Sequence, residues 1–233
     1  LCMAVDCLQV YLFRRVSDDL RKNHLDGVSG LRAMLAPLVL SGHVKFNDSK
    51  GIFEFWNGAK IYLCHCQHEK DMYKYQGAEI HVLLIDELTL FTENIYRFLR
   101  GRVRLGGLQV PKEYRHKLPL ILCGSNPGNI GHAWVKAMFV DYAPPMEITR
   151  TPEAEGGMLR QYIPARLSDN PTLLENDPQY ESRLAGLGSP SLVAAMKNGD
   201  WDIVEGAYFA EFRRERHVLP PFSLPVHWPR IMA

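Results

Sequence analysis

The sequence lacks any long apolar run, and it carries almost no net charge. Its longest apolar stretches, such as residues 82–85 and 118–123, fall far short of the roughly 20 residues that a membrane helix needs. The formal charge is only +1, from 27 Lys and Arg against 26 Asp and Glu. Overall charge therefore supplies no attraction for nucleic acid, which would need a local basic patch. We expect no membrane span, no signal peptide and no membrane partner.

Cysteine is scarce, and low-complexity sequence is absent. The five cysteines form an odd number, and two of them lie inside apolar, strand-like runs. This usage is typical of buried, reduced thiols, so the sequence indicates a reducing compartment. The remaining composition, with 46% hydrophobic and 10% aromatic residues, excludes collagen-like, coiled-coil and disordered chains. The length suits one folded domain with at most a small appendage.

The first part of the chain carries signals for a strand, a helical section and a hairpin. A β-prone run at 9–13 predicts a strand that leads into a pair of arginines. Apolar residues and His24 recur at helical intervals between 17 and 38, which predicts a helical section. Residues 52–64 hold Asn57-Gly58 at their centre, a pair that tolerates the positive φ angles of a tight turn. This pattern predicts an antiparallel hairpin.

Two later strands are apolar throughout, as is typical of strands buried on both faces of a parallel sheet. They are predicted at 80–85 and 118–123, with a helix at 89–99 between them. Strand, helix and strand in this order indicate an α/β fold. A further helix is predicted at 132–140, and from residue 169 onwards short helices are joined by Pro and Gly.

Polar residues suited to nucleotide chemistry follow both of these strands. Asp86 and Glu87 resemble a Walker B element, in which the first carboxylate holds Mg²⁺ and the second takes a proton from an attacking water. Ser125 and Asn126 follow the second strand at the same sheet edge, where many ATPases sense the γ-phosphate. Taken alone, each pattern also occurs in ordinary strand ends and turns, so both interpretations stay open.

Four arginines cluster after the Walker B candidate, at Arg97, Arg100, Arg102 and Arg104. Such side chains can reach the phosphates of DNA or of a nucleotide on a neighbouring subunit. The alternative is a solvated helix face, on which Glu93 and Arg97 form a simple i, i+4 pair. The sequence leaves these two interpretations evenly balanced.

Taken together, the motifs resemble the large terminase subunit of tailed bacteriophages, the ATPase that drives DNA into procapsids. The segments that carry the resemblance follow one another in the family's order over nearly the whole chain. They are Phe53-Glu54-Phe55 with Asn57-Gly58, Glu69-Lys70-Asp71, residues 75–79, residues 84–87, Thr92-Glu93, Tyr96-Arg97, residues 99–104, residues 125–128, Ile163-Pro164-Ala165, Asp169-Asn170-Pro171, and Gly199-Asp200-Trp201-Asp202 with Gly206 and Phe209.

The resemblance implies a fold and a division into domains. The fold would be a mainly parallel sheet of the additional-strand P-loop NTPase type, with flanking helices and a β-hairpin. Residues 1–168 would form the ATPase core, and residues 169–233 a small helical linker subdomain that leads towards a nuclease domain.

The resemblance also implies ligands, partners and residue roles. Asp86 would bind Mg²⁺, Glu87 would be the catalytic base, and Ser125 and Asn126 would lie in the motif that couples hydrolysis to DNA movement. Arg14 and Arg15 match an arginine pair that we expect near the nucleotide. The ligands would be ATP and Mg²⁺, and the partners double-stranded DNA, the portal protein, the small terminase subunit and further copies in a ring. The location would be the bacterial cytoplasm, with transient docking on the procapsid portal.

Two features of the sequence depart from the family. The phosphate-binding loop, a Gly-rich stretch that ends in Gly-Lys-Ser/Thr, occurs nowhere in the 233 residues. Residues 1–8 resemble the helix that follows that loop. The second departure concerns the nuclease domain: residues 225–230 resemble its lead-in, and its first metal-binding aspartate would come next. Because the loop supplies the groups that hold the β- and γ-phosphates, we expect these residues alone to bind ATP weakly and to hydrolyse it poorly.

Two other functions remain open. One is a helicase-like DNA translocase of the same P-loop group, against which the terminase-like stretch from Asp169 to Trp201 argues. The other is a non-catalytic terminase fragment that only binds DNA or the portal, which the missing phosphate loop favours and the intact Asp86-Glu87 pair opposes.

Overall fold

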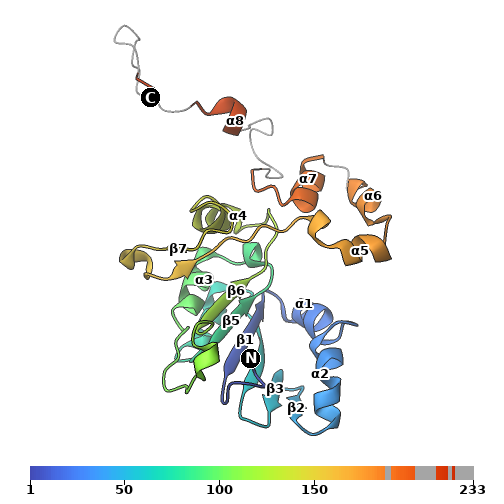
Figure 1. Ribbon diagram of the computed structural model, residues 1–233, viewed down its shortest axis with the longest axis vertical. Coiled ribbons are helices and arrows are strands. Elements are labelled where there is room, and N and C mark those ends of the chain that lie inside the picture. Colours follow the sequence, from blue (N-terminus) through green and yellow to red (C-terminus); the bar gives the residue numbers. More distant parts are fainter. Residues whose placement is uncertain (187–189, 203–213, 220–221, 224–233) are drawn as a thin grey trace. The chain divides into compact units, whose positions relative to one another are not determined.

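The computed structural model describes residues 1–186, 190–202, 214–219 and 222–223, which belong to two compact units (Figure 1). The first unit comprises residues 1–164 and the second residues 165–233. The terminase resemblance implies a division a little later, after residue 168. Gly206, Phe209 and the segment 225–230, which contribute to the terminase resemblance, lie outside the described residues.

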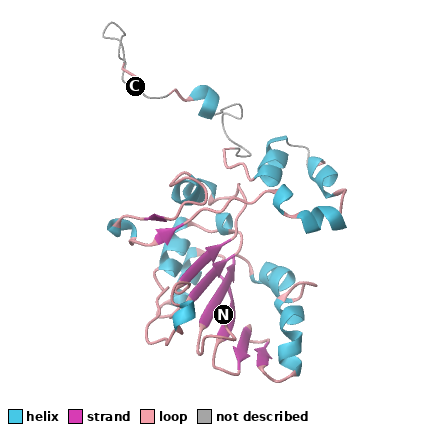
Figure 2. Cartoon of the chain, in the orientation of Figure 1, coloured by secondary structure: helices cyan, strands magenta, loops and turns pink. Residues whose placement is uncertain are grey.

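A six-stranded sheet forms the centre of the first unit (Figure 2). Its strands lie in the order β2-β3-β4-β1-β5-β6. They are β1 (Gln9–Arg14), β2 (Val44–Asn47), β3 (Ile52–Phe55), β4 (Lys60–His65), β5 (Val82–Ile85) and β6 (Leu120–Cys123). Strand β1 pairs in parallel with β4 and β5, and β5 pairs in parallel with β6. Only β3 runs the other way, against both β2 and β4, so the predicted mainly parallel sheet with a hairpin is confirmed.

The register of the parallel strands brings three chain segments to one edge of the sheet. Phe13 near the end of β1 lies opposite Ile85, the last residue of β5. Ile85 in turn lies opposite Cys123, the last residue of β6. The residues that follow these strands therefore meet at the carboxyl edge, where open α/β sheets bind their ligands. Phe13 and Ile85 are almost completely buried, which anchors this edge in the core.

The core of the first unit consists of buried side chains from the N-terminal segment and from five strands and their connections. One cluster of buried residues comprises Val5, Leu8, Val10, Leu25, Val44, Phe53, Phe55, Ala59, Val82 and Leu118. Helix α2 (Leu31–Leu40) packs Leu31, Leu35 and Leu38 partly against this cluster. In Figure 1, α1 (Ser17–Leu20) and α2 lie beside the end of the sheet that β2 and β3 form.

Further helical segments connect the strands of the first unit. They are the π-helix η1 (Arg21–Leu25), the 3-10 helices η2 (Glu69–Tyr75), η3 (Leu88–Leu90), η4 (Lys112–Tyr114) and η6 (Glu153–Glu155), the α-helices α3 (Glu93–Arg100) and α4 (His132–Val135), and the π-helix η5 (Lys136–Val140). A short antiparallel pair, β7 (Thr149–Arg150) with β8 (Leu159–Arg160), forms a separate sheet.

Three segments differ from the sequence predictions. The helix predicted at 89–99 begins only at Glu93, because Thr92 caps it by accepting a hydrogen bond from the Ile95 N–H at 3.4 Å. Strand β2 was not predicted. Residues 2–7 form turns rather than the helix that the family resemblance implies, because Cys7 has a left-handed backbone (φ 58°) and its N–H donates to the Asn57 carbonyl at 3.0 Å.

The second unit contains short helices. They are η7 (Leu167–Asp169), α5 (Pro171–Asn176), α6 (Tyr180–Ala185), α7 (Pro190–Asn198) and α8 (Arg214–His217). Of these, α5, α6 and α7 correspond to the three predicted from residue 169 onwards, whereas η7 and α8 were not predicted. Asn170 caps α5 by accepting from the Leu173 N–H at 3.2 Å, and Pro171 stands at the first helical position, where a proline is tolerated. Ion pairs link Arg183 to Asp177 and Lys197 to Glu181. Among the described residues of both units, none of the helices combines the length and the apolar character needed to cross a membrane.

Candidate active site

Backbone hydrogen bonds continue beyond the strand ends and hold the carboxyl edge of the sheet together. The Asp86 N–H donates to the Phe13 carbonyl at 2.9 Å, and the Gly124 N–H donates to the Ile85 carbonyl at 2.9 Å. The Leu88 N–H returns to the Gly124 carbonyl, also at 2.9 Å. The residues that follow β1, β5 and β6 are therefore held side by side, and Asp86 and Ser125 come to the same edge, as the sequence predicts.

Among the described residues, partners reach only one of the two carboxylate oxygens of Asp86. Its Oδ2 accepts from Arg14 Nη1 at 2.6 Å and lies 2.8 Å from His24 Nε2. Since an ionised carboxylate only accepts hydrogen bonds, Nε2 is the protonated nitrogen in this contact. No described residue contacts Oδ1 by a hydrogen bond or an ion pair. Beside it, Gly124 leaves room, because a Cβ at that position would lie 3.6 Å from Oδ1.

This arrangement suits a hydrated Mg²⁺ held by a single carboxylate. Mg²⁺ keeps several of its waters and is commonly held by one or two carboxylates together with substrate phosphates. Asp86 offers one free oxygen and an open space beside it. In the part of the chain that the structure describes, no three His, Cys, Asp or Glu side chains form a group that could hold a metal ion.

Glu87 has a strained backbone and a fixed side chain. Its φ of 54° and ψ of 59° lie in the left-handed region, which a residue with a side chain rarely adopts. Asn126 Nδ2 donates to Glu87 Oε1 at 3.1 Å, so the structure joins the second acid to the segment after β6. Strained residues of this kind cluster at active sites, where the surrounding structure holds them in place.

Thr89 is a residue of this site that the sequence analysis missed. It is completely buried, its N–H donates to Ser125 Oγ at 3.1 Å, and its hydroxyl donates to the Asn126 carbonyl at 3.0 Å. Asn129 Nδ2 lies 3.4 Å from the same hydroxyl. Thr89 thus links the segment after β5 with the segment after β6. No local pattern marks it, since its partners lie some 40 residues further along the chain.

The two arginines after β1 take different places. Arg14 contacts Asp86, and its side chain is 16% exposed. Its Nε is buried without a hydrogen-bond partner among the described residues. Arg15 Nη1 donates to the Leu90 carbonyl at 3.2 Å, so it supports the η3 turn rather than the carboxylate. Their predicted place near a nucleotide stays a prediction.

His24 is the second residue that the sequence analysis missed. The helical spacing placed it among the residues of a packed helix face, whereas the structure directs it towards Asp86. Its side chain is 29% exposed, close to the 28% of Asp86. The contact joins residues 62 positions apart, so only the folded chain brings it about.

The four predicted arginines each make a contact other than with Asp86 or Glu87. Arg97 pairs with Glu93 at 2.6 Å, which is the i, i+4 pair of the alternative interpretation. Arg100 donates to the Glu155 carbonyl at 3.0 Å, Arg102 lies over the ring of Phe98 at 4.7 Å, and Arg104 lies 3.7 Å from Glu79. Val103 bridges to Ile80, two residues before β5, so this segment runs beside the amino ends of the strands.

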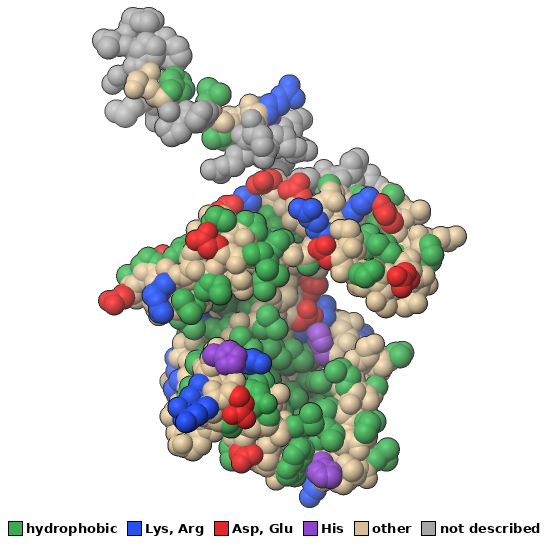
Figure 3. Space-filling model, viewed as in Figure 1, with side chains coloured by type: hydrophobic (Ala, Val, Ile, Leu, Met, Phe, Trp, Pro, Cys, Tyr) green, Lys and Arg blue, Asp and Glu red, His purple; other side chains and the backbone are tan. Residues whose placement is uncertain are grey.

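On the face drawn in Figure 3, charged side chains of both signs are interspersed with hydrophobic ones. This mixture agrees with the formal net charge of +1. A grip on nucleic acid would therefore depend on a few local cations.

Burial disfavours the thiolate form of two cysteines near the carboxyl edge, Cys64 and Cys123. Burial raises the pKa of Cys123, the last residue of β6, to about 12. Burial likewise raises the pKa of Cys64 in β4 to about 12. At physiological pH the neutral thiol is therefore the favoured form of both side chains.

The fold of the chain is that of phage large terminases. The large terminase of the thermophilic bacteriophage D6E has a TM-score of 0.59 and 18% sequence identity to the chain. The same protein in complex with ADP has a TM-score of 0.60 and 17% identity, and in complex with ATP-gamma-S 0.56 and 17%. Each match covers 96% or 97% of this chain and only 47% or 48% of the terminase, so the chain spans about half of that protein's length. No protein-family model matches the chain, and no curated protein matches it in sequence.

Proposed function

We propose that the chain is the ATP-hydrolysing part of a phage or prophage motor that moves double-stranded DNA into procapsids. The observation that carries the proposal is that two successive acidic residues, Asp86 and Glu87, follow β5 at the carboxyl edge of a terminase-like sheet. Asp86 keeps one oxygen free, and Asn126 holds Glu87 in place. The related terminase structures with ADP and ATP-gamma-S support a nucleotide as the ligand of such an edge.

Each side chain then has a distinct task. Asp86 would hold Mg²⁺ through Oδ1, and the ion would supply positive charge to the phosphates during transfer. Glu87 would orient the attacking water and accept its proton, since Asn126 leaves the second oxygen of Glu87 unengaged by any described residue. Arg14 would keep Asp86 Oδ2 occupied, so that the other oxygen faces the ligand.

Ser125 and Asn126 would pass a change at Glu87 to the rest of the unit. Their hydrogen bonds to Thr89 and Glu87 connect the acidic turn to the segment after β6. A shift of Glu87 on loss of the γ-phosphate would therefore move this segment as well. In a motor, such a movement is what couples hydrolysis to DNA translocation.

The assembled motor would include partners beyond this chain. We propose double-stranded DNA, a portal protein, a small terminase subunit and further copies of the chain in a ring, in the cytoplasm of a bacterial host and docked on the portal during packaging. Exposed arginines such as Arg104 would contact phosphates of the DNA.

ATP hydrolysis by the chain, with Mg²⁺ and duplex DNA present, tests the proposal. We expect slow turnover that Glu87→Gln abolishes, because the amide cannot accept the proton of the water. Glu93→Gln is the matched control, since Glu93 pairs with Arg97 outside the site. Turnover that persists unchanged in Glu87→Gln would contradict the assignment.

A non-catalytic part that binds DNA or the portal is the second candidate. The observation that favours it is the absence of a Gly-Lys-Ser/Thr phosphate loop from the 233 residues. No turnover above background, together with DNA affinity that falls steeply with salt, would support this candidate over the first.

A further inference from the structure

We propose that His24 is a positioning residue for Asp86, fixing the carboxylate so that Oδ1 faces the metal, and that an ion-pair network around Asp48 holds His24 in place. The inference rests on the proposed function, because it takes Asp86 as the metal ligand. It adds a residue and a supporting network that lie outside the Walker B pattern.

Two donors from different elements converge on one oxygen of Asp86. Arg14 approaches Oδ2 from β1, the neighbouring strand in the sheet, at 2.6 Å. His24 approaches the same oxygen from η1 at 2.8 Å. One contact would leave the carboxylate free to swing about its side-chain bonds, whereas two contacts from separate directions restrict it. Groups that hydrogen-bond a metal-ligating carboxylate in this way orient the ligand for the ion.

A π-helical turn explains how His24 reaches the carboxylate. Leu20 and Leu25 are five residues apart and both are buried. An α-helix turns residues i and i+5 in different directions, but an i→i+5 turn brings them to one side. The Asp26 N–H donates to the Arg21 carbonyl at 2.8 Å, which closes this wider turn. The two leucines thereby anchor η1 in the core, and His24 is left to face the sheet edge.

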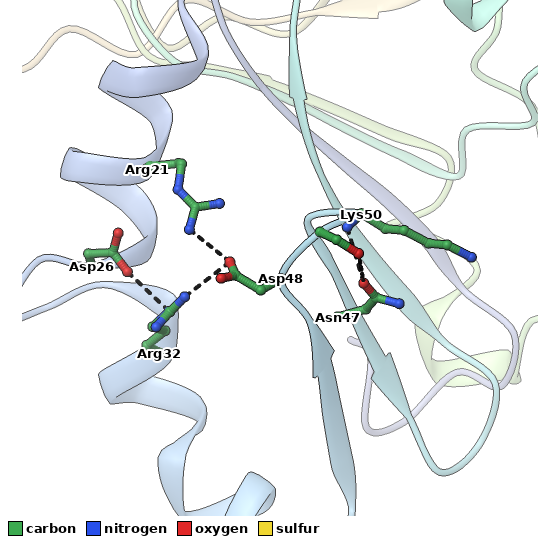
Figure 4. A network of polar contacts seen from close by, with 7 residues as sticks. Arg21, Asp26, Arg32, Asn47, Asp48 and Lys50 are labelled. Carbon is green, nitrogen blue, oxygen red and sulfur yellow. Dashed lines mark hydrogen bonds and ion pairs between the residues drawn. The ribbon is translucent and has the colours of Figure 1, made fainter.

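Salt bridges hold both ends of this turn to the β2–β3 hairpin (Figure 4). Asp48, in the turn between β2 and β3, accepts from Arg21 at 2.7 Å and from Arg32 at 3.1 Å. Arg32 also pairs with Asp26 at 3.0 Å. Arg21 opens η1 and Asp26 directly follows it, so the network holds η1 at its start and at its end.

The ion pairs around Asp48 are exposed, so they position η1 more than they add to the free energy of unfolding. Exposed ion pairs contribute little stability singly, and networks with a shared partner contribute more. Asp48 is shared by two guanidinium groups, and the Arg21 hydrogen bond holds the pKa of Asp48 below its usual range. The hairpin turn is in this way a fixed support for the helix that carries His24.

Binding of Mn²⁺ alone to the full chain, followed by electron paramagnetic resonance, tests the role without requiring turnover. The quantity compared between variants is the affinity of the Mn²⁺ site that is lost in Asp86→Asn. We expect His24→Ala to weaken it about tenfold, which is typical for loss of a residue that orients a metal ligand. We expect His24→Gln to restore most of it, because the glutamine amide places an N–H donor where Nε2 stood.

Matched variants separate positioning from a general effect on the fold. His43→Ala removes an exposed histidine that contacts Trp56 and Ser41, and is expected to leave Mn²⁺ binding unchanged. Asp48→Asn is expected to weaken binding by less than His24→Ala does, because it loosens η1 without removing the donor.

Three results would overturn the inference in distinguishable ways. If Asp86→Asn abolishes the site while His24→Ala binds Mn²⁺ as well as the wild type or more tightly, His24 has no positioning role and the proposed function stands. If the wild type and Asp86→Asn bind equally, the metal site of the proposed function fails, and the role of His24 fails with it. Weak binding in both His24→Ala and His24→Gln would also contradict positioning through the Nε2 hydrogen bond.

Discussion

Thr89 and Ser125 lie 36 residues apart in the sequence, and hydrogen bonds join their backbone and side-chain atoms at 3.1 Å and 3.3 Å. The first runs from the Thr89 N–H to Ser125 Oγ, and the second joins the two hydroxyls. Since Thr89 is completely buried, these bonds are shielded from water and fix the acidic turn to the neighbouring segment. The turn and the segment after β6 therefore act as one structural piece, which the following predictions probe.

The left-handed backbone of Glu87 predicts an unusual order of stability among its variants. Glycine adopts this conformation without the steric cost that a Cβ imposes, so Glu87→Gly is expected to be about 1 kcal/mol more stable than Glu87→Ala. Chemical denaturation of the two variants measures the difference. At Glu93, the first residue of α3, the order is expected to reverse, since alanine favours a helix. An alanine variant at 87 as stable as the glycine variant would show that the backbone there is unstrained.

Gly124 predicts a loss of metal binding without a loss of stability. A methyl group there would lie 3.6 Å from Asp86 Oδ1, an ordinary contact distance that nevertheless fills the space for the waters of an ion. We expect Gly124→Ala to unfold like the wild type and to bind Mn²⁺ several-fold more weakly. Gly107→Ala, with no atom within 4 Å of its added Cβ, is the control. Equal Mn²⁺ affinity in both variants would mean that Oδ1 does not face the ion.

Gly30 predicts a large destabilisation at the corner between η1 and α2. An added Cβ would stand 2.5 Å from the Leu25 carbonyl oxygen and 2.9 Å from the Gly27 carbonyl oxygen, and neither backbone atom can move freely. We expect Gly30→Ala to lower the free energy of unfolding by about 1–3 kcal/mol, the usual range for overpacking. Gly27→Ala, whose nearest contact is 3.4 Å, should cost much less. Urea titrations of the two variants give the comparison.

Arg104 and Arg97 predict different effects on DNA binding. Arg104 lies 3.7 Å from Glu79, a loose pair, and its side chain is 46% exposed, whereas Arg97 is held by Glu93 at 2.6 Å. If this surface contacts phosphates, Arg104→Ala should reduce the slope of log affinity against log salt by about 0.9. Arg97→Ala should change it less. A slope near zero in the wild type would exclude a phosphate grip by these arginines.

Asp71 predicts an acid-dependent part of the stability. Its hydrogen bonds with Lys74 and with the backbone N–H of His68 lower its pKa from 3.8 to about 2. A carboxyl with a lowered pKa stabilises the fold above its unfolded pKa, and this contribution is lost as pH falls towards its folded pKa. The advantage of the wild type over Asp71→Asn should therefore be full at about pH 5 and shrink towards about pH 2. An advantage that does not change with pH, measured by denaturation, would contradict this origin.

The strands and the acidic edge could be predicted because their signals are local. Apolar runs at 80–85 and 118–123 stop where β5 and β6 stop, and Asn57-Gly58 marks the turn between β3 and β4. Once the strands are parallel, the residues that follow them must meet at one edge. The placement of Asp86 beside the segment of Ser125 follows from this topology alone.

His24, Thr89 and β2 could not be predicted because their positions depend on partners far along the chain. His24 faces Asp86 only through a π turn, and helical spacing assumes the narrower α turn. Strand β2 has four residues, of which Val44 alone is buried, so its apolar signal is weak. Helix α3 begins at Glu93 because Thr92 caps it. The Thr92 cap is a local signal, but the prediction follows the apolar periodicity over 89–99 and therefore begins the helix too early.

Because Arg14 and His24 both contact Asp86 Oδ2, the Asp86 side chain loses conformational entropy when the chain folds rather than when a ligand binds. A side chain that becomes fixed only when a ligand arrives reduces the binding free energy by about 0.5–1.5 kcal/mol. Here the carboxylate loses that freedom while the chain folds, through Arg14 and His24. If Asp86 holds the proposed ion, part of the cost of fixing its side chain is therefore met during folding rather than on binding. A substitution that loosens residues 17–25 should lower the melting temperature and the ligand affinity together, even when it touches no ligand.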